Sequence, residues 1–253
     1  MNKTEPLVGT PSALDAMGVP GSEQFDLTLL ANFVHQVVNP LNGIAGTLDN
    51  LADDLITDKQ RRKQRLNAAR AQIEQCITLL RNLAFLATGG VADQDRRLVV
   101  LPQVIIESAM FFQEEGAING IRIELNDRAT QNKVAGHPEL IRQVLMNIFD
   151  NCTKYGKFGS TIDVKQWIQA STESAIITIR GESKYPLDPG DMEKVFQLGF
   201  RGGNAKKMIA SGTGLGLYIC KQIVQLHKGS IAVQSDGSSG ILFTIKLPGG
   251  RRG

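Results

Sequence analysis

The chain has 253 residues, 42% of them hydrophobic and 21% charged, which is enough for two ordinary globular domains. The formal net charge of +3 is small and spread along the chain, so nucleic acid is not an expected partner. Three separate cysteines without a CxxC pair predict neither a disulfide framework nor a zinc site. No leader-like segment and no apolar run of about 18 residues appears, so we expect a cytosolic protein without a membrane partner.

The first part of the chain predicts a helical hairpin. Residues 1 to 22 mix Pro, Gly, Ser and Thr without periodicity and are expected to form a flexible segment. Apolar residues three and four positions apart then follow, as in the seam of a packed helix, at Leu27, Leu30, Val34, Val37, Leu41, Ile44, Leu48, Leu51 and Leu55. After a polar break at TDKQ the spacing returns at Leu66, Ala69, Ile73, Cys76, Leu80 and Leu83. Residues 23 to 90 are therefore expected to form an antiparallel hairpin, and because one hairpin cannot bury such seams alone, we expect a four-helix bundle in a homodimer.

The rest of the chain predicts a second domain of mixed type. The glycines of TGGVADQD are expected to end the hairpin, and residues 91 to 98 to form a linker. Residues 99 to 248 are expected to form an α+β two-layer sandwich with helices on one face of the sheet, followed by a tail at 249 to 253. The expected helices are 101 to 115, 138 to 155 and about 212 to 227, and the expected strands are 121 to 126, 161 to 170, 174 to 180, 230 to 235 and 241 to 248, the last two as a hairpin.

One histidine stands on a polar face of the first helix. The positions opposite the apolar seam are Thr28, Asn32, His35, Asn39 and Asn42, so we expect the His35 side chain to be exposed. Pro40 cannot donate to the preceding turn and is expected to kink the helix just after the histidine. An exposed, neutral imidazole is a nucleophile that can carry a phosphoryl group on one ring nitrogen. Gln36 follows it, where a nucleophilic histidine usually has a carboxylate nearby.

Two further segments have the residue types of a nucleotide site. RQVLMNIFDNCTKYGK places Asn147 and Asn151 on one helix face with Lys154 one turn further, a set that could hold magnesium and the phosphates it bridges. SGTGLGLYICKQIV places Gly212, Gly214 and Gly216 immediately before an apolar helix, whose first amides can bind phosphate oxygens. A Phe-x-x-x-Phe pair and a basic loop lie between the two segments, at Phe196, Phe200, Arg201, Lys206 and Lys207.

In this order, the motifs resemble the H, N, F and G2 boxes of the sensor histidine kinases of two-component systems. HQVVNPL is similar to the H box, NIFDNCTKY to the N box, KVFQLGF to the F box, and GTGLGLYICKQIVQLHKGSIAVQS to the G2 box, over about residues 25 to 248. The resemblance implies a dimerisation and phosphotransfer bundle followed by a GHKL-type ATP-binding domain. It also implies ATP and magnesium as cofactors and His35 as the phospho-acceptor.

The same resemblance implies roles for individual residues. Asn151 would hold magnesium, Lys154 would contact phosphate, Tyr155 would line the nucleotide pocket, and residues 201 to 211 would form a lid over ATP. Asn39, four positions after the histidine, would help to hydrolyse a partner's phospho-aspartate. The implied nucleotide-binding set is Asn147, Asn151, Lys154, Tyr155, Glu182, Phe200, Arg201, Lys206, Lys207, Gly212, Thr213, Gly214, Leu215 and Gly216.

The sequence departs from the family pattern at two places. Gln36 stands where the family usually has Glu or Asp as a general base, and an amide can orient the imidazole but cannot take its proton. The G1 box, usually Asp followed by a GxG turn, reads IRGESKYPLDPGD. Counting back from Phe196 aligns Glu182 with the Asp that accepts the adenine amino group, whereas counting along the strand aligns Gly181. Selectivity for adenine is therefore expected to suffer more than phosphate binding.

Two functions follow from this pattern. The first is a histidine kinase core that uses Mg-ATP to phosphorylate His35 and passes the phosphoryl group to an aspartate of a response-regulator receiver domain, with an upstream sensor protein as a further partner. The second is a histidine phosphotransfer adaptor, or pseudokinase, whose His35 receives phosphate from another protein. The N, F and G2 boxes favour the kinase, while Gln36 and the altered G1 turn favour the adaptor. A scaffold that only docks partners would leave the polar stripe around His35 without a purpose.

Overall fold

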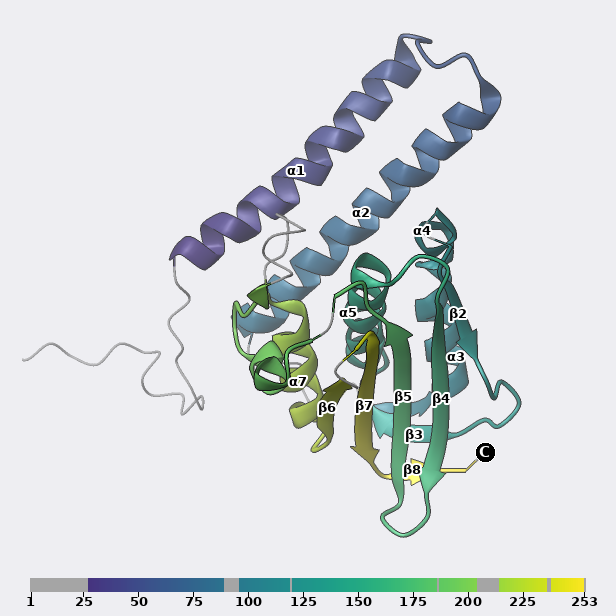
Figure 1. Ribbon diagram of the computed structural model, residues 1–253, viewed down its shortest axis with the longest axis vertical. Helices are drawn as coiled ribbons and strands as arrows, with labels where there is room; N and C mark the ends of the chain where they lie inside the picture. The colour runs from purple at the N-terminus through teal and green to yellow at the C-terminus, as the bar shows by residue number, and fades with distance from the viewer. Residues whose placement is uncertain are drawn as a thin grey trace, which may run out of the picture.

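A helical hairpin leads into a separate α+β domain (Figure 1). The computed structural model describes residues 27–88, 96–118, 120–185, 187–203, 214–235 and 238–252. The expected fold class is confirmed, while the expected flexible segment at 1 to 22 and most of the linker lie outside the described residues. Within those residues, no helix is both long and apolar enough to cross a bilayer.

The hairpin consists of α1 (Leu27–Ala52) and α2 (Lys59–Thr88), which lie side by side (Figure 1). Helix α1 continues through Pro40 and ends at Ala52, so Leu55, which we expected in the seam, lies in the turn beyond the helix. Asp58 caps the start of α2, because its carboxylate accepts the backbone N–H of Arg61 at 2.6 Å. The turn between the helices is therefore defined by a local polar contact.

The predicted apolar seam divides into two stripes. One stripe packs inside the hairpin and includes Ile44, Leu51, Ala69 and Cys76, which are all buried. The other stripe is exposed to between 45% and 53% and repeats every seven residues, at Val34, Leu41 and Leu48 on α1 and at Leu66, Ile73 and Leu80 on α2. A seven-residue apolar repeat is the pattern that packs one helix against another. Half of the seam therefore has no covering element among the described residues of one chain.

The second domain is built on a five-stranded sheet in the order β2-β4-β5-β7-β6. Its strands are β2 (Arg122–Leu125), β4 (Thr161–Gln169), β5 (Ser174–Glu182), β6 (Ser230–Ser235) and β7 (Gly240–Pro248). The β2–β4 pair is parallel and the other pairs are antiparallel, with β6 and β7 forming the expected hairpin. Alternate residues are buried along β4 and along the second half of β5, so one face of the sheet points into the core, while the first four residues of β5 are all buried.

Helices cover that inner face. They are α3 (Leu101–Met110), α4 (Gln113–Ile118), α5 (Pro138–Tyr155) and α7 (Gly216–Leu226). Leu145 of α5 and Ile223 of α7 meet Ile177 of β5 and Ile245 of β7, and each of the four side chains is at most 1% exposed. Two 3-10 turns, η3 (Pro189–Asp191) and η4 (Lys194–Phe196), lead from β5 towards α7. Helix α5 therefore has one side on the sheet and another side towards α2 of the hairpin.

A second, small sheet includes residues that we expected in the linker and in the tail. It has the order β1-β3-β8 and is formed by β1 (Arg97–Val100), β3 (Lys133–Gly136) and β8 (Gly250–Arg251). Strand β1 begins inside the segment that we expected as a linker, and β8 lies in the segment that we expected as a tail. The helix expected at 101 to 115 is interrupted at Phe111 and Phe112, where Phe112 turns inward and packs on Phe149 of α5 with ring centroids 6.2 Å apart.

Candidate functional site

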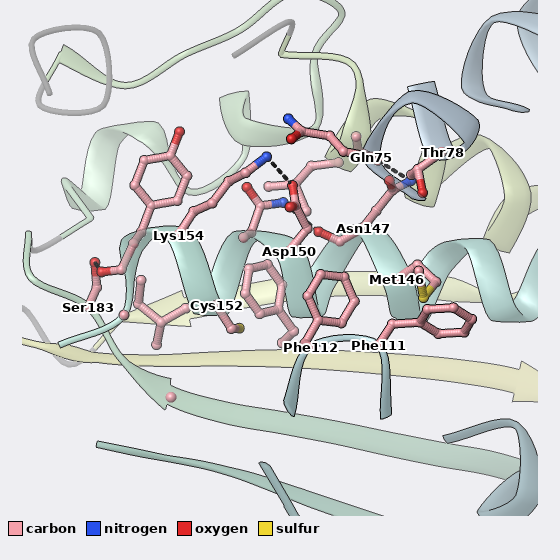
Figure 2. A pocket seen from close by; sticks show the side chains of 18 of the residues that line it. Gln75, Thr78, Phe111, Phe112, Met146, Asn147, Asp150, Cys152, Lys154 and Ser183 are labelled. Atoms are coloured by element: carbon pink, nitrogen blue, oxygen red, sulfur yellow. Dashed lines mark hydrogen bonds and ion pairs between the residues drawn. The ribbon is translucent and has the colours of Figure 1, made fainter. Parts of the chain in front are cut away.

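A cleft of about 1520 Å³ lies between the hairpin and the α+β domain. Its walls come from α2, from the exposed side of α5, from the end of β5 and from the segment before α7. Figure 2 shows Lys154, Asp150 and Asn147 in sequence along α5, with Gln75 and Thr78 of α2 across from them, Phe112 below them and Phe111 beside Met146. One cleft thus combines residues from both parts of the chain.

Helix α5 places the two predicted carboxamides one turn apart on the cleft side. Asn147 is 4% exposed, and its Nδ2 donates to the carbonyl of Gly216 at the start of α7 at 3.3 Å. Asn151 is half-buried, and its Nδ2 donates to the Asn147 carbonyl at 2.8 Å. Because the Asn151 donor is used within its own helix, its carboxamide oxygen is the atom that could serve as a ligand for a hard cation.

The predicted cation Lys154 is paired inside the cleft. Its Nζ lies 2.7 Å from Oδ2 of Asp150, one turn earlier on α5, and both side chains are mostly shielded from solvent (Figure 2). The sequence reasoning missed Asp150, although its spacing of four from Lys154 was a signal for an ion pair. The carboxylate could serve as an oxygen ligand beside Asn151. It also holds the Lys154 ammonium in the cleft, where a phosphate oxygen could replace the carboxylate as the partner of Lys154.

The glycine segment forms the wall opposite α5. Gly214 has a φ of +67°, and a Cβ there would lie only 2.6 Å from the carbonyl carbon of Gly199, so only glycine fits. Helix α7 begins at Gly216, and a Cβ at Gly216 would meet the Asn147 carboxamide at 3.6 Å. Leu215 has a fully buried side chain and does not line the cleft, unlike its neighbours Gly214 and Gly216. The start of α7 thus lies at the cleft wall, where its first amides could bind an anion, and the role that the glycine pattern predicted remains a prediction.

The end of β5 resolves the alternative at the G1 box. Gly181 lies on the inner face of the sheet, where a Cβ would be 4.0 Å from Sγ of Cys152 on α5. Glu182 lies on the opposite face at the rim of the cleft, half-exposed, with its carboxylate 3.4 Å from Nζ of Lys157. The position that points between the sheet and α5 is thus Gly181, which has no acceptor side chain. This geometry disfavours the role that the sequence assigned to Glu182.

Cys152 makes this end of the cleft apolar. Burial, together with the neighbouring Asp150 carboxylate, raises the pKa of the Cys152 thiol to about 12. The thiol is therefore neutral at physiological pH and is a weak hydrogen-bond partner. Tyr155, Phe200 and Arg201 line the same cleft, as expected. Lys206, Lys207, Gly212 and Thr213 lie outside the described residues.

His35 is exposed on α1, as the polar stripe predicted, and Asn39 is exposed one turn further along the helix. Gln36 is half-buried and lines the cleft. The segment that carries the histidine thus borders the cavity into which Asn147, Asn151 and Lys154 project. An amide at Gln36 can bind a donor or an acceptor there, but it cannot remove a proton.

The arrangement suits a triphosphate better than a free metal ion. No group of three His, Cys, Asp or Glu side chains gathers as a metal site within the part of the chain that the structure describes. Carboxamides, one ammonium, a glycine segment and a helix start face each other across the cleft instead. These groups fit a phosphate chain with a bridging magnesium ion, while the end near Gly181 and Cys152 offers little to distinguish one base from another.

Two family models match the chain. Residues 27–90 match the His Kinase A (phospho-acceptor) domain, and residues 136–251 match the histidine kinase-, DNA gyrase B- and HSP90-like ATPase. The chain is 26% identical over 233 residues to the sensor protein KdpD of Clostridium acetobutylicum and 25% identical over 227 residues to the sensor protein SrrB of Staphylococcus aureus. Both matches cover 89% of this chain, which spans 25% of KdpD and 38% of SrrB.

A solved structure supports the same assignment. The mycobacterial sensor histidine kinase MprB superposes with a TM-score of 0.53 at 26% identity, covering 62% of this chain and 98% of the MprB chain. The residues 136–251 that match the ATPase model include the N-box helix, the glycine segment and the strands between them. Both parts of the chain therefore point to one family.

Proposed function

Because the chain belongs to the sensor histidine kinases of two-component systems, we propose that it binds Mg-ATP in the cleft and transfers the γ-phosphoryl group to His35. The observation that carries the proposal is the shared cleft. Gln36, the neighbour of His35 on α1, and the Asn147 to Lys154 side of α5 line one continuous cavity. The phosphate-binding groups and the acceptor segment therefore belong to one space.

On this proposal, the chain's own groups hold the triphosphate at several points. The α7 start and the close backbone at Gly214 receive phosphate oxygens, and Lys154 exchanges its Asp150 partner for a phosphate oxygen. Magnesium would neutralise charge between the phosphates, with Asn151 and Asp150 supplying oxygen ligands. Burial of these groups in the cleft strengthens each electrostatic contact relative to water.

The transfer step needs a nucleophilic nitrogen and an exit for one proton. The unprotonated ring nitrogen of His35 forms a bond to the γ-phosphorus as the bond to the β-phosphate oxygen breaks. The imidazolium then loses the proton on its other nitrogen. Gln36 can accept a hydrogen bond from that N–H and so orient the ring, but the proton goes to water at the exposed helix face. Loss of a general base typically costs about 10² to 10⁴ in rate, so we expect slow autophosphorylation.

We further propose that phospho-His35 donates its phosphoryl group to an aspartate of a response-regulator receiver domain. The exposed α1 face around His35 is open to such a partner in the described residues. Asn39 is exposed one turn from His35 on α1, and on this proposal its carboxamide would orient a water molecule for hydrolysis of the phospho-aspartate. An upstream sensor protein would supply the signal.

The exposed half of the apolar seam supports a homodimer. The stripe at Val34, Leu41 and Leu48 and the stripe at Leu66, Ile73 and Leu80 are about half-exposed side chains at seven-residue spacing on two adjacent helices. A second hairpin with the same stripes would bury both sets and complete a four-helix bundle. Dimerisation would leave the polar face with His35 accessible.

Incubation of the purified protein with magnesium and γ-labelled ATP tests the kinase proposal. We expect label on the wild type and none on His35→Ala, while Asn151→Ala loses most of the label because its cation ligand is gone. An unlabelled wild type would refute the kinase, and a labelled His35→Ala would refute the assignment of the acceptor. An unlabelled receiver domain, added to the labelled protein after the nucleotide is removed, tests the second step, because it should gain the label as His35 loses it.

A phosphotransfer adaptor is the second candidate, and Gly181 is the observation that favours it. A nucleotide domain without the base acceptor is expected if selection for ATP has relaxed. The adaptor would gain label on His35 from a phosphorylated receiver domain but not from ATP. Calorimetry with Mg-ATP separates the two, because the kinase must bind the nucleotide and the adaptor need not.

A further inference from the structure

A buried carboxamide of the hairpin contacts the nucleotide site directly. Asn82 lies on α2 and is 3% exposed. Its Oδ1 accepts a hydrogen bond from Nε2 of Gln143 at 2.6 Å, and its Nδ2 donates to Oδ1 of Asn147 at 3.4 Å. Nδ2 of Asn147 returns a hydrogen bond to Oδ1 of Asn82 at 3.4 Å. The hairpin and the N-box helix are therefore joined by a cluster of three carboxamides.

The cluster occupies the polar atoms of Asn147. Its Oδ1 accepts from Asn82, while its Nδ2 is shared between Asn82 and the carbonyl of Gly216. Asn82, Gln143 and Asn147 are between 3% and 6% exposed, so water does not compete for these bonds. Buried carboxamides need such partners, because an unpaired polar group is costly away from water. The Asn147 side chain is thus committed to the hairpin in this arrangement.

We propose that Asn82 is an interdomain latch that competes with the triphosphate and magnesium for the Asn147 carboxamide. The inference rests on the proposed function, because it assigns Asn147 to the phosphate end of the cleft. When Asn82 is engaged, the ATP-binding domain is docked on α2 and Asn147 cannot turn its carboxamide to a ligand. When the ligand takes Asn147, the amide pair opens and the domain is released towards His35.

The latch makes docking and nucleotide binding mutually antagonistic. Two ligands that compete for one group reduce each other's affinity by the same factor, so a docked hairpin weakens nucleotide binding and bound nucleotide weakens docking. The long 3.4 Å amide pair suits this role, because a stronger pair would keep the domain docked at any nucleotide concentration. Any signal that moves α2 would thereby reach the nucleotide site through one side chain.

Asn82→Leu tests the latch, since leucine matches the size of asparagine and removes both hydrogen bonds to Asn147. The matched control is Thr78→Val, one turn earlier on α2, where the lost hydroxyl bonds only to the carbonyl of Glu74 in its own helix. The double variant Asn82→Leu with Gln143→Leu also removes the Gln143 carboxamide that the single variant leaves without Asn82, while Asn147 keeps its hydrogen bond to the Gly216 carbonyl, so it guards against a folding defect in the single variant. All proteins are measured as the full chain.

The first measurement needs no nucleotide. Hydrogen exchange of peptides that cover residues 78 to 86 reports how often the α2 contact opens, and we expect exchange to rise about five-fold in Asn82→Leu, as for the loss of one net hydrogen bond. Thr78→Val should match the wild type. Unchanged exchange in both Asn82 variants would refute the latch, whether or not the protein binds ATP.

The second measurement is the affinity for a non-hydrolysable ATP analogue with magnesium, by calorimetry. We expect Asn82→Leu and the double variant to bind about five-fold more tightly than the wild type, because the competitor for Asn147 is gone. Equal or weaker binding would overturn the competition and make Asn82 a support for Asn147 instead. No binding by any variant would refute the proposed function together with the nucleotide linkage, while the exchange data still decide the latch.

Discussion

Restoring a carboxylate at Gly181 should restore selectivity for adenine. Gly181 faces the inner side of the sheet, and a Cβ there would meet Cγ1 of Ile162 at 3.8 Å and Sγ of Cys152 at 4.0 Å, which are ordinary contact distances. Its φ is not among the positive values, so an L side chain adds no backbone strain. Gly181→Asp therefore fits sterically and directs a carboxylate into the end of the cleft where the family places its base acceptor.

The size of the effect follows from the hydrogen bond that the carboxylate can accept. A hydrogen bond to a charged group contributes about 1.5 to 3 kcal/mol, which corresponds to roughly 10- to 150-fold in affinity. Adenine offers an amino group at this edge, whereas guanine offers a carbonyl that the carboxylate repels. We expect the wild type to bind Mg-ATP and Mg-GTP within a few-fold of each other, and Gly181→Asp to prefer ATP by at least about 10-fold.

Calorimetric titration of both nucleotides against wild type, Gly181→Asp and Glu182→Gln measures the ratio. Glu182→Gln is the matched control, since it removes a carboxylate from the adjacent residue on the other face of β5, where it pairs with Lys157. We expect it to leave the ratio unchanged. A wild type that already prefers ATP by 100-fold would contradict the reasoning from strand geometry. Loss of this preference in Glu182→Gln would then show that Glu182 is the acceptor.

Three more predictions concern the dimer, the glycine segment and the core. Leu41→Glu combined with Leu48→Glu should convert the dimer to a monomer in light scattering, because each leucine buried in the dimer contributes about 1.5 to 3 kcal/mol to association. The control Leu226→Glu on α7 should leave the dimer intact, and a dimer that survives the double change would refute the exposed stripe as the interface. Gly214→Ala should lower the melting temperature and weaken nucleotide binding, since a left-handed alanine costs about 1 to 3 kcal/mol even before its Cβ meets Gly199; an unchanged melting curve would contradict the tight approach. Burial lowers the pKa of His227 below its ordinary 6.5, so the unfolded chain binds a proton at a higher pH than the folded chain does. The stability that is present above pH 6.5 should therefore be lost as the pH falls through the folded-state pKa. His227→Gln should flatten the dependence of unfolding free energy on pH in denaturant titrations, and a steeper dependence would contradict the prediction.

Local patterns predicted the parts of the fold whose residues decide their own structure. The N-box helix is observed at Pro138–Tyr155, as predicted, and the long strands β4 and β5 lie where they were expected, with alternating burial along β4 and along the second half of β5. The short strands β1, β3 and β8 were missed, because two to four residues carry no periodic signal and become strands only through pairing with each other. The interruption at Phe112 likewise depends on a distant ring, that of Phe149.

The candidate site shows the same division between local and distant causes. Asn147, Asn151 and the glycines before α7 were found because each motif is continuous in the sequence. Gly181 and Glu182 could not be separated, since the face on which each side chain lies is set by pairing across the sheet, where Gly181 is opposite Ile241 and Glu182 is opposite Gly240. Asn82 had no signal at all, because an asparagine in an amphipathic helix is unremarkable until Gln143 and Asn147 are seen to meet it.

The two ends of the cleft together explain why control at Asn82 would be effective. A base subsite formed by Gly181 and a neutral Cys152 contributes little polar binding energy, so the affinity for a nucleotide depends mainly on the triphosphate end. Asn147 belongs to that end, and Asn82 competes for it. In a site with a strong base contact, losing one carboxamide would be a small fraction of the total affinity. In this site the carboxamide supplies a larger fraction of the total affinity. Gly181→Asp raises the affinity for ATP without changing the contact between Asn82 and Asn147. We therefore expect this variant to reduce the effect of docking on nucleotide occupancy at a fixed ATP concentration.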